Sequence, residues 1–273
     1  MALSFSYICM TVAFFGNTDY SVEMLKKIIA LGYEVPYVCT TQDQVVKVRG
    51  KEKTIIQPVS KFARDLGLNL THDIYEPVAD VFVVVAFKIL PPEVYEKPGK
   101  GCINIHPSLL PDYRGAAPIE WAIMNGDTYS GVTSFIIGKN LDSGDILDQR
   151  LVSLDPEKTK EELMPEFIFQ GQGCLWKTLR DLEYGWEIKR PQVGIPKKAP
   201  KIGRILLQED EDPKKIYNYT RALGESEKLE MILHGVQCKI IRGELGDGKF
   251  YPLIVKPQGK RRMYYKDFLN GRK

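Results

Sequence analysis

Residues 81–87, with the sequence VFVVVAF, are the feature that most limits what this chain can fold into. An unbroken apolar run of this length is typical of a strand covered on both faces, as in parallel sheets flanked by helices. A second apolar run at 10–15 ends at Gly16 and leads into an amphipathic segment at 22–30. Strand, glycine turn and helix in this order form the unit of a parallel sheet. The sequence therefore predicts an α/β fold with a mostly parallel, Rossmann-like sheet and helices on both of its faces.

The same alternation continues to about residue 186. Apolar periodicity predicts helices at 58–66, 118–124 and 159–182, and strands at 34–40, 131–137 and 146–152. Residues 41–53, TQDQVVKVRGKEK, are polar and basic around a glycine. This composition predicts a mobile loop.

The C-terminal part of the chain has a different character. Prolines at 191, 196 and 200 and the pair Lys197-Lys198 are typical of an extended linker. Beyond it, 212–223 has a helical pattern, and 229–245 and 250–255 alternate like strands. We therefore expect a large α/β domain at 1–187, a linker at 188–204 and a small β-rich domain at 205–273.

The net charge differs between the two parts of the chain. Residues 187–273 carry 20 Lys and Arg against 11 Asp and Glu, a balance of +9, whereas residues 1–186 carry 18 against 24, a balance of −6. A basic C-terminal third suggests a polyanionic partner, and a solvated basic surface is the ordinary alternative.

Cysteine usage and the N-terminus bear on the compartment. The five cysteines are scattered without any spacing suited to zinc, so we expect no metal site and reduced, buried thiols. Residues 1–15 lack the basic region and the cleavage site of a signal peptide, and whether translation starts at Met1 or Met10 is left open. No apolar run approaches the length of a membrane span. We expect a soluble, cytoplasmic monomer with no membrane association and no obligate protein partner.

Asn104 and His106 are the polar residues that most suggest chemistry. They are two positions apart on what reads as a strand end, so both side chains point to one face. An Asn amide donates hydrogen bonds at any pH, and a His can donate one and carry a proton, so the pair can hold an oxyanion. Asp142, in an Asp-Ser-Gly loop after a predicted strand, could stabilise the imidazolium and orient it. The three suggest acyl transfer, and a structural pair beside a plain turn is the alternative.

The block around these residues resembles the 10-formyltetrahydrofolate-dependent formyltransferases. The likeness is carried, in order and spacing, by residues 104–111 (NIHPSLLP), 114–118 (RGAAP) and 141–145 (LDSGD). It implies that Asn104, His106 and Asp142 are catalytic. It also implies that 10-formyltetrahydrofolate is the formyl donor and that no metal takes part.

The resemblance further implies where the donor binds. Residues 87–91, FKILP, are similar to the family loop that lines the pterin pocket, and a plain strand-to-helix turn is the alternative. In a parallel sheet ligands gather beyond the carboxyl ends of strands, where this loop, Asn104 and His106 would converge on one cleft. The predicted donor-binding residues are Phe87, Lys88, Ile89, Leu90, Ser108, Leu109, Leu110 and Pro111.

Two basic stretches resemble the branch of the family that acts on initiator methionyl-tRNA. Residues 49–51, Arg-Gly-Lys, are similar to an element that enters the tRNA acceptor end, although Val45-Val46 replaces a proline-containing turn. Residues 259–271 resemble the C-terminus of that branch, but several dozen residues of its barrel are absent between Leu245 and Gly248, so we expect a reduced barrel. The predicted tRNA-binding residues are Arg49, Lys51, Lys53, Lys260, Arg261 and Arg262, with a solvated charge cluster as the alternative.

The resemblance thus predicts transfer of a formyl group to the α-amine of initiator methionyl-tRNA. One alternative is a formyltransferase that acts on an amino-sugar nucleotide or on glycinamide ribonucleotide. Another is a folate- or RNA-binding homologue that has lost activity.

Overall fold

The structure is a computed structural model, which describes residues 10–48 and 50–271. The chain forms two compact units, each assembled from separate stretches of sequence. The first contains the chain up to Pro111 with 132–150 and 168–195, and the second contains 112–131, 151–167 and 196–273. The division of the chain at 1–187, 188–204 and 205–273 stays a prediction.

The first unit is built on a seven-stranded sheet with the order β5-β2-β1-β6-β7-β8-β9. Its strands are β1 (Val12–Gly16), β2 (Tyr37–Cys39), β5 (Leu70–Thr71), β6 (Val81–Val85), β7 (Cys102–His106), β8 (Tyr129–Ile136) and β9 (Ile146–Ser153). The pairs from β5 to β7 are parallel, and β7 pairs with β8 antiparallel. The predicted mostly parallel sheet is confirmed, with the apolar strand β6 at its centre.

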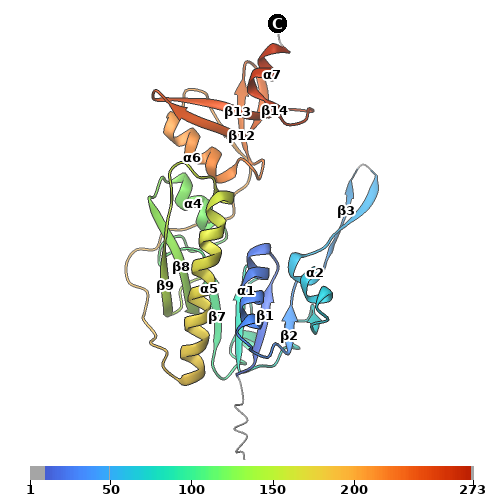
Figure 1. Cartoon of the computed structure of the whole chain (residues 1–273), viewed down its shortest axis with the longest axis vertical. Helices are drawn as coiled ribbons and strands as arrows, with labels where there is room; N and C mark the ends of the chain where they lie inside the picture. The colour runs from blue at the N-terminus through green and yellow to red at the C-terminus, as the bar shows by residue number, and fades with distance from the viewer. Residues whose placement is uncertain (1–9, 49, 272–273) are drawn as a thin grey trace, which may run out of the picture. The chain divides into compact units, whose positions relative to one another are not determined.

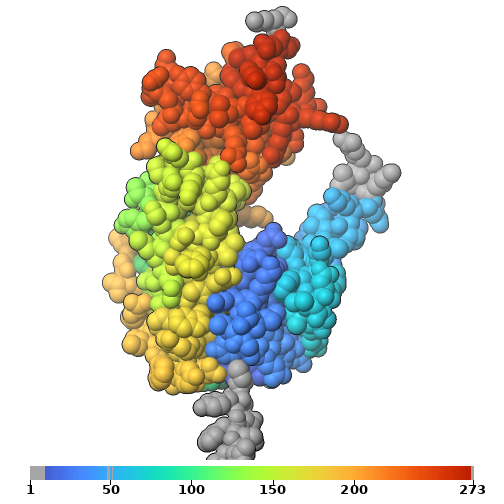
Figure 2. Space-filling view, viewed as in Figure 1, coloured from blue at the N-terminus to red at the C-terminus, as the bar shows by residue number. Residues whose placement is uncertain are grey.

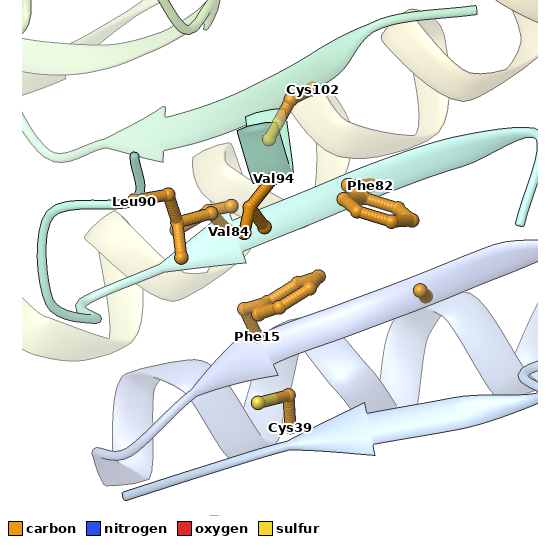
Figure 3. Packing of buried hydrophobic residues seen from close by; sticks show 8 residues of the cluster. Phe15, Cys39, Phe82, Val84, Leu90, Val94 and Cys102 are labelled. Carbon is orange, nitrogen blue, oxygen red and sulfur yellow. The ribbon is translucent and has the colours of Figure 1, made fainter. Parts of the chain in front are cut away.

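Helices cover both faces of this sheet. The helices α1 (Asp19–Ala30) and α5 (Lys160–Tyr184) lie side by side in front of the strands in Figure 1. On the other face, Val94 of α3 (Pro92–Tyr95) joins a buried cluster with Phe15 and Phe82, whose rings are 5.1 Å apart (Figure 3). The alternation of β1 explains this division, since Phe15 and Gly16 point to opposite faces.

The turn from β1 into α1 is fixed by a capping box. The Thr18 hydroxyl accepts a 3.3 Å hydrogen bond from the Ser21 N–H, and the Ser21 hydroxyl accepts one of 3.2 Å from the Thr18 N–H. Gly16 has no room for a side chain, because an added Cβ would lie 2.6 Å from the Cβ of Ser21. The first turn of α1 is therefore held close to the carboxyl end of β1.

Residues 41–53 do not form the predicted mobile loop. The strands β3 (Gln44–Val48) and β4 (Lys51–Ile55) form a two-stranded antiparallel hairpin, which stands away from the sheet of its unit (Figures 1 and 2). The prediction was wrong because it weighed the charges and not the β-branched residues that favour strands. The base of the hairpin is anchored, since Asp43 accepts 2.9 Å bonds from the Gln57 N–H and from Arg64 of α2 (Pro58–Asp65).

The second unit contains a five-stranded sheet with the order β10-β11-β12-β13-β14. Its elements are α4 (Pro118–Met124), β10 (Ile205–Leu207), α6 (Pro213–Leu223), β11 (Leu229–Leu233), β12 (Val236–Gly246), β13 (Lys249–Pro257), β14 (Met263–Tyr264) and α7 (Tyr265–Asn270). Asp212 caps α6, because its side chain accepts hydrogen bonds from the backbone N–H groups of Lys214 and Lys215. The predicted β-rich C-terminal part is confirmed.

The point where the sequence predicted a reduced barrel is a tight turn. The long strands β12 and β13 are joined by Asp247 and Gly248, with φ values of +48° and +71°. Positive φ at both central residues is the signature of a type I′ hairpin turn, for which Asp-Gly is a preferred sequence. The shortened segment therefore closes as a regular hairpin.

Within the described residues, no helix is both long and apolar enough to cross a membrane.

Candidate active site

Strand β7 presents Asn104 and His106 on one face of the sheet. Its parallel register sets Asn104 beside Val84 of β6, on the face that also carries Phe15 and Val94. His106 is 5% exposed, and the edge of its ring packs on Phe135, with the ring centroids 6.5 Å apart. Asn104 is half-buried, and among the described residues its amide has no hydrogen-bond partner. An amide that is held near the carboxyl end of a strand and is available to a ligand can donate hydrogen bonds to an oxyanion.

Asp142 meets His106, as the sequence predicted. Its Oδ2 lies 3.9 Å from the Nδ1 of His106, and the carboxylate side chain is 8% exposed. This is an ion-pair distance and is longer than a hydrogen bond. At this distance the carboxylate can set the direction of the imidazole ring.

The backbone of the Asp142 loop explains how the carboxylate reaches the histidine. Asp142 has a φ of +49°, in the left-handed region that side chains rarely adopt. A Cβ at Gly144 would lie 1.7 Å from the carbonyl oxygen of Ile136, so only glycine allows the loop to fold back on β8. The Asp-Ser-Gly sequence therefore has two roles. Its glycine allows the chain to follow this path, and its aspartate supplies the carboxylate.

The turn after His106 is held by two residues that the sequence did not single out. The Thr133 hydroxyl donates a 2.6 Å bond to the Ser108 carbonyl and accepts a 3.1 Å bond from the Leu110 N–H. The Gln149 amide donates to the Leu110 carbonyl at 2.9 Å and to Thr133 at 3.1 Å. Ser108 and Leu110 are buried, whereas Leu109 and Pro111 are partly exposed. A single Thr and a single Gln carry no local signal, so only the fold reveals them.

The four residues predicted to line the donor site after β6 divide by burial. Lys88 and Ile89 are exposed, with Ile89 at 78%, whereas Leu90 belongs to the buried cluster. Phe87 is partly buried, with its ring 5.7 Å from that of Phe15. The loop is therefore anchored by Phe87 and Leu90 and presents the two residues between them.

Asn17 holds the ends of neighbouring strands at this edge of the sheet. Its Oδ1 accepts hydrogen bonds of 2.9 Å from the Thr40 hydroxyl, the Thr41 N–H and the Thr41 hydroxyl. Nearby, the Ser21 hydroxyl donates a 2.7 Å bond to the Val85 carbonyl at the end of β6.

The residues predicted to bind tRNA lie in different surroundings. Lys51 and Lys53 are on β4, with the Lys53 side chain exposed, and Arg49 falls outside the described residues. Lys260 and Arg261 are exposed, and neither forms an ion pair within the part of the chain that the structure describes. Their charges are available to a partner.

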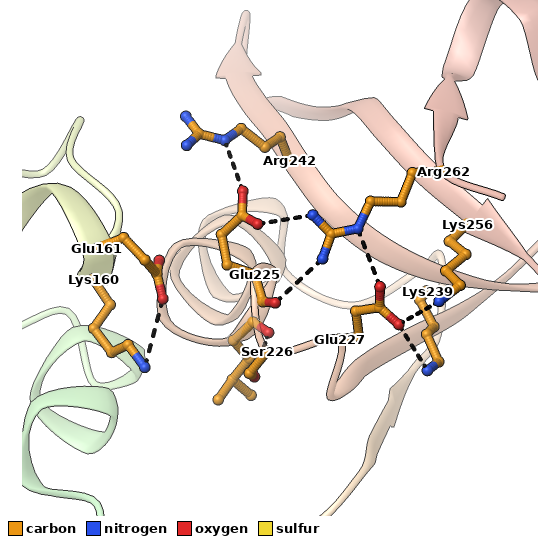
Figure 4. Close-up of polar contacts among 10 residues, drawn as sticks. Lys160, Glu161, Glu225, Ser226, Glu227, Lys239, Arg242, Lys256 and Arg262 are labelled. Atoms are coloured by element: carbon orange, nitrogen blue, oxygen red, sulfur yellow. Dashed lines mark hydrogen bonds and ion pairs between the residues drawn. The ribbon is translucent and has the colours of Figure 1, made fainter. Parts of the chain in front are cut away.

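Arg262 is held within its own unit (Figure 4). Its guanidinium bonds Glu225 at 2.9 Å and Glu227 at 3.1 Å. Glu227 also accepts from Lys256 at 2.7 Å and from Lys239 at 3.1 Å. These donors, Lys256 first, lower the pKa of Glu227 to about 2. Arg262 therefore has a structural role in the fold.

A cavity of about 710 Å³ lies in the first unit at the opposite ends of the sheet's strands, away from His106 and Asp142. The start of β7 and the end of β8 line it, including Gly101, Cys102 and Ile136. The His106 and Asp142 pair is at the opposite end of β7. We place the chemistry at the polar cluster, because a catalytic site needs converging polar groups as well as volume.

Comparison with known proteins shows the family of the chain. The family model for formyl transferase matches residues 10–179. Proteins named methionyl-tRNA formyltransferase from Thermodesulfovibrio yellowstonii and Pelotomaculum thermopropionicum are 32% and 31% identical to the chain, over 96% of it and 96% of each relative.

Solved structures share the fold. A sugar 3N-formyl transferase, solved with dTDP and 5-N-formyl-THF, superposes with a TM-score of 0.69 at 20% identity, covering 92% of this chain and 99% of that chain. Methionyl-tRNA formyltransferase from Clostridium thermocellum gives a TM-score of 0.60 at 15% identity, covering 91% and 98%. By its sequence match, its sheet and its Asn, His and Asp cluster, the chain belongs to the formyl transferase family.

Proposed function

We propose that this formyltransferase moves the formyl group of 10-formyltetrahydrofolate to the α-amine of initiator methionyl-tRNA. The observation that carries the choice of amine is the extent of the sequence likeness. Relatives named methionyl-tRNA formyltransferase align over 96% of the chain, so the likeness includes the basic C-terminal unit. An enzyme acting on this substrate would work in the cytoplasm, and we propose that it does so as a monomer.

Chemistry begins when the neutral amine attacks the formyl carbon and a C–N bond forms. The formyl oxygen becomes an oxyanion, which the Asn104 amide and the protonated His106 ring stabilise by hydrogen bonds. The Nδ1 of His106 faces Asp142 at 3.9 Å, which leaves its Nε2 to act as the donor. Stabilisation of the oxyanion lowers the barrier because the charge develops only as the new bond forms.

The second step breaks the bond between the formyl carbon and N10 of the folate. The attacking amine loses a proton, which Asp142 takes, directly or through water, and Asp142 returns this proton to N10 as N10 leaves. The carbonyl re-forms, and tetrahydrofolate and the formylated amine are the products. Asn104, His106 and Asp142 supply every role in this sequence, and no metal is invoked.

The substrates would approach from the carboxyl edge of the parallel strands. The loop at 87–90 and the turn at 108–111 would receive the folate, with Lys88 and Ile89 as its exposed part. Lys51 and Lys53 of the hairpin and Lys260 and Arg261 of the C-terminal unit would contact the tRNA phosphates. Arg49, which belongs to the same Arg-Gly-Lys motif as Lys51, would join them.

An amino-sugar nucleotide is the alternative acceptor. The observation that favours it is the two-residue turn at Asp247 and Gly248, at a point where the resemblance to the methionyl-tRNA branch implies a longer barrel segment. The two readings share the formyl donor and the catalytic groups, and they differ only in the amine.

One assay separates these readings. Purified protein is given 10-formyltetrahydrofolate with methionyl-tRNA, with an amino-sugar nucleotide, or with glycinamide ribonucleotide, and tetrahydrofolate release is followed. We expect turnover with methionyl-tRNA alone. Preferential turnover of the sugar or of the ribonucleotide would replace the proposed acceptor, and no turnover of any amine would favour the inactive homologue.

A further inference from the structure

The segment expected to be a plain linker contains a residue that contacts the catalytic loop. The Gln192 side-chain amide donates one hydrogen bond of 3.0 Å to the Asp142 carbonyl and another of 2.9 Å to the Gly144 carbonyl. The two hydrogens of one NH2 group thus bridge two carbonyls of a single turn. Both distances are those of good N–H to O hydrogen bonds.

Burial shows that this contact is specific to Gln192. In residues 190–198, all of which the structure describes, every other residue is exposed and Gln192 alone is partly buried. The segment is tied down next to it, because Arg190 and Ile146 exchange backbone hydrogen bonds of 3.0 and 2.8 Å. The chain therefore passes close to the Asp142 loop and turns one polar side chain into it.

The Asp142 loop needs such support. Asp142 has a left-handed φ of +49°, which the backbone of a non-glycine residue does not favour by itself. Within the loop, the Ser143 hydroxyl donates a 3.0 Å bond to the Asn140 carbonyl. A strained conformation persists where surrounding contacts hold it. Gln192 supplies that contact on both sides of Ser143, while the Asp142 carboxylate faces His106.

We propose that Gln192 is a positioning residue for formyl transfer, which keeps the Asp142 carboxylate at His106 by holding the backbone of its loop. Gln192 touches the loop carbonyls and acts only through Asp142. The inference rests on the proposed function for its kinetic part. Residues 188–204 then contribute to the catalytic centre as well as linking two parts of the chain.

Variants at this position distinguish the effect of donating a hydrogen bond from the effect of side-chain size. Gln192→Met keeps the length but cannot donate, Gln192→Lys can still donate, and Gln192→Glu turns acceptor oxygens toward two carbonyls. We expect kcat to fall in the order Gln, Lys, Met, Glu, with Met roughly ten-fold or more below wild type and KM for both substrates little changed. Lys197→Met is the matched control, because Lys197 lies further along the same segment and bonds Asp112 at 2.9 Å.

A double-mutant cycle tests whether the effect passes through Asp142. In an Asp142→Ala background, Gln192→Met should cause no further loss of kcat, because there is no carboxylate left to position. Full additivity of the two losses would overturn the proposal. An equal loss in Lys197→Met would overturn it too, since the effect would then belong to the segment as a whole.

Hydrogen exchange of the backbone amides in residues 138–146 provides a test without any substrate. Exchange there should be faster in Gln192→Met than in wild type and unchanged in Lys197→Met. This arm remains decisive if wild type proves inactive on methionyl-tRNA, which would refute the proposed function alone. Unchanged exchange in Gln192→Met would show that Gln192 does not hold the loop.

Discussion

The Nδ1 of His106 lies 3.9 Å from the Oδ2 of Asp142, and both residues are more than nine-tenths buried. Burial of this pair away from water strengthens the interaction between the two groups. It also means that, in a variant that lacks one of these side chains, water from the solvent cannot take over its role. The first two predictions follow from this relationship.

His106→Ala and Asn104→Ala should each lower kcat by roughly a hundred-fold or more, as loss of an oxyanion donor does. Binding of tetrahydrofolate, measured by titration, should change little, because neither residue belongs to the loops predicted to hold the folate. His72→Ala is a suitable control, since that ring bonds the Thr40 carbonyl at 3.0 Å. Near-normal kcat in His106→Ala would rule out the mechanism.

Asp142→Asn should lower kcat by roughly ten-fold or more, because an amide cannot take the proton of the attacking amine. Asp145→Asn changes an exposed carboxylate in the same loop and should leave kcat unchanged. Single-turnover formylation measures both. Equal rates for the two variants would mean that the buried carboxylate has no special role.

Replacing Lys260 and Arg261 should change tRNA binding and leave stability unchanged, whereas replacing Arg262 should do the reverse. The double variant Lys260→Ala with Arg261→Ala should flatten the dependence of log K on log salt for methionyl-tRNA by up to about 1.4 to 1.8 units, because each phosphate contact releases counterions. Its melting temperature should stay at the wild-type value. Arg262→Ala should instead lower the melting temperature by about 2 to 4 °C and leave the salt slope unchanged. Parallel salt plots for wild type and the double variant would exclude this surface from tRNA binding.

Glu227 should make stability depend on pH in the acid range. Its pKa falls from 4.5 to about 2 in the folded protein, chiefly through Lys256, so the carboxylate favours folding above about pH 4.5. That contribution is lost as pH falls from about 4.5 toward 2, where the folded form must also take up the proton. Glu227→Gln should therefore melt below wild type at pH 7, and the gap should close by pH 2. Calorimetry at several pH values checks it, and a gap that did not vary with pH would count against this ion pair.

Asn17→Ala should raise KM for both substrates more than it lowers kcat, because it frees the chain that leads into the hairpin and borders the folate loop. Asp80→Ala is the matched control at the other edge of the sheet. Asp80 joins β6 to β1 at their amino ends by accepting from the Thr11 N–H at 2.7 Å and the Thr11 hydroxyl at 2.8 Å. If both variants shift KM alike, Asn17 is only a structural residue.

The sequence predicted the parts of this molecule whose signals are local. The apolar run of β6, the alternation that places Asn104 with His106, and the Asp-Ser-Gly loop can all be read from a few neighbouring residues. The hairpin was misread because charge masked its β-branched pattern. Thr133, Gln149 and Gln192 could not be found, because their importance comes from the carbonyl groups that the fold brings to them.

The type I′ turn at Asp247 and Gly248 makes the end of this hairpin a point where the chain could accept added residues. A hairpin end that needs only two residues can be opened without moving the strands on either side, and loop tips are where insertions are best tolerated. A longer barrel segment could be grafted between these two residues while β12 and β13 keep their register. Such a chimera would lengthen the C-terminal unit at a single point and leave the catalytic residues in place.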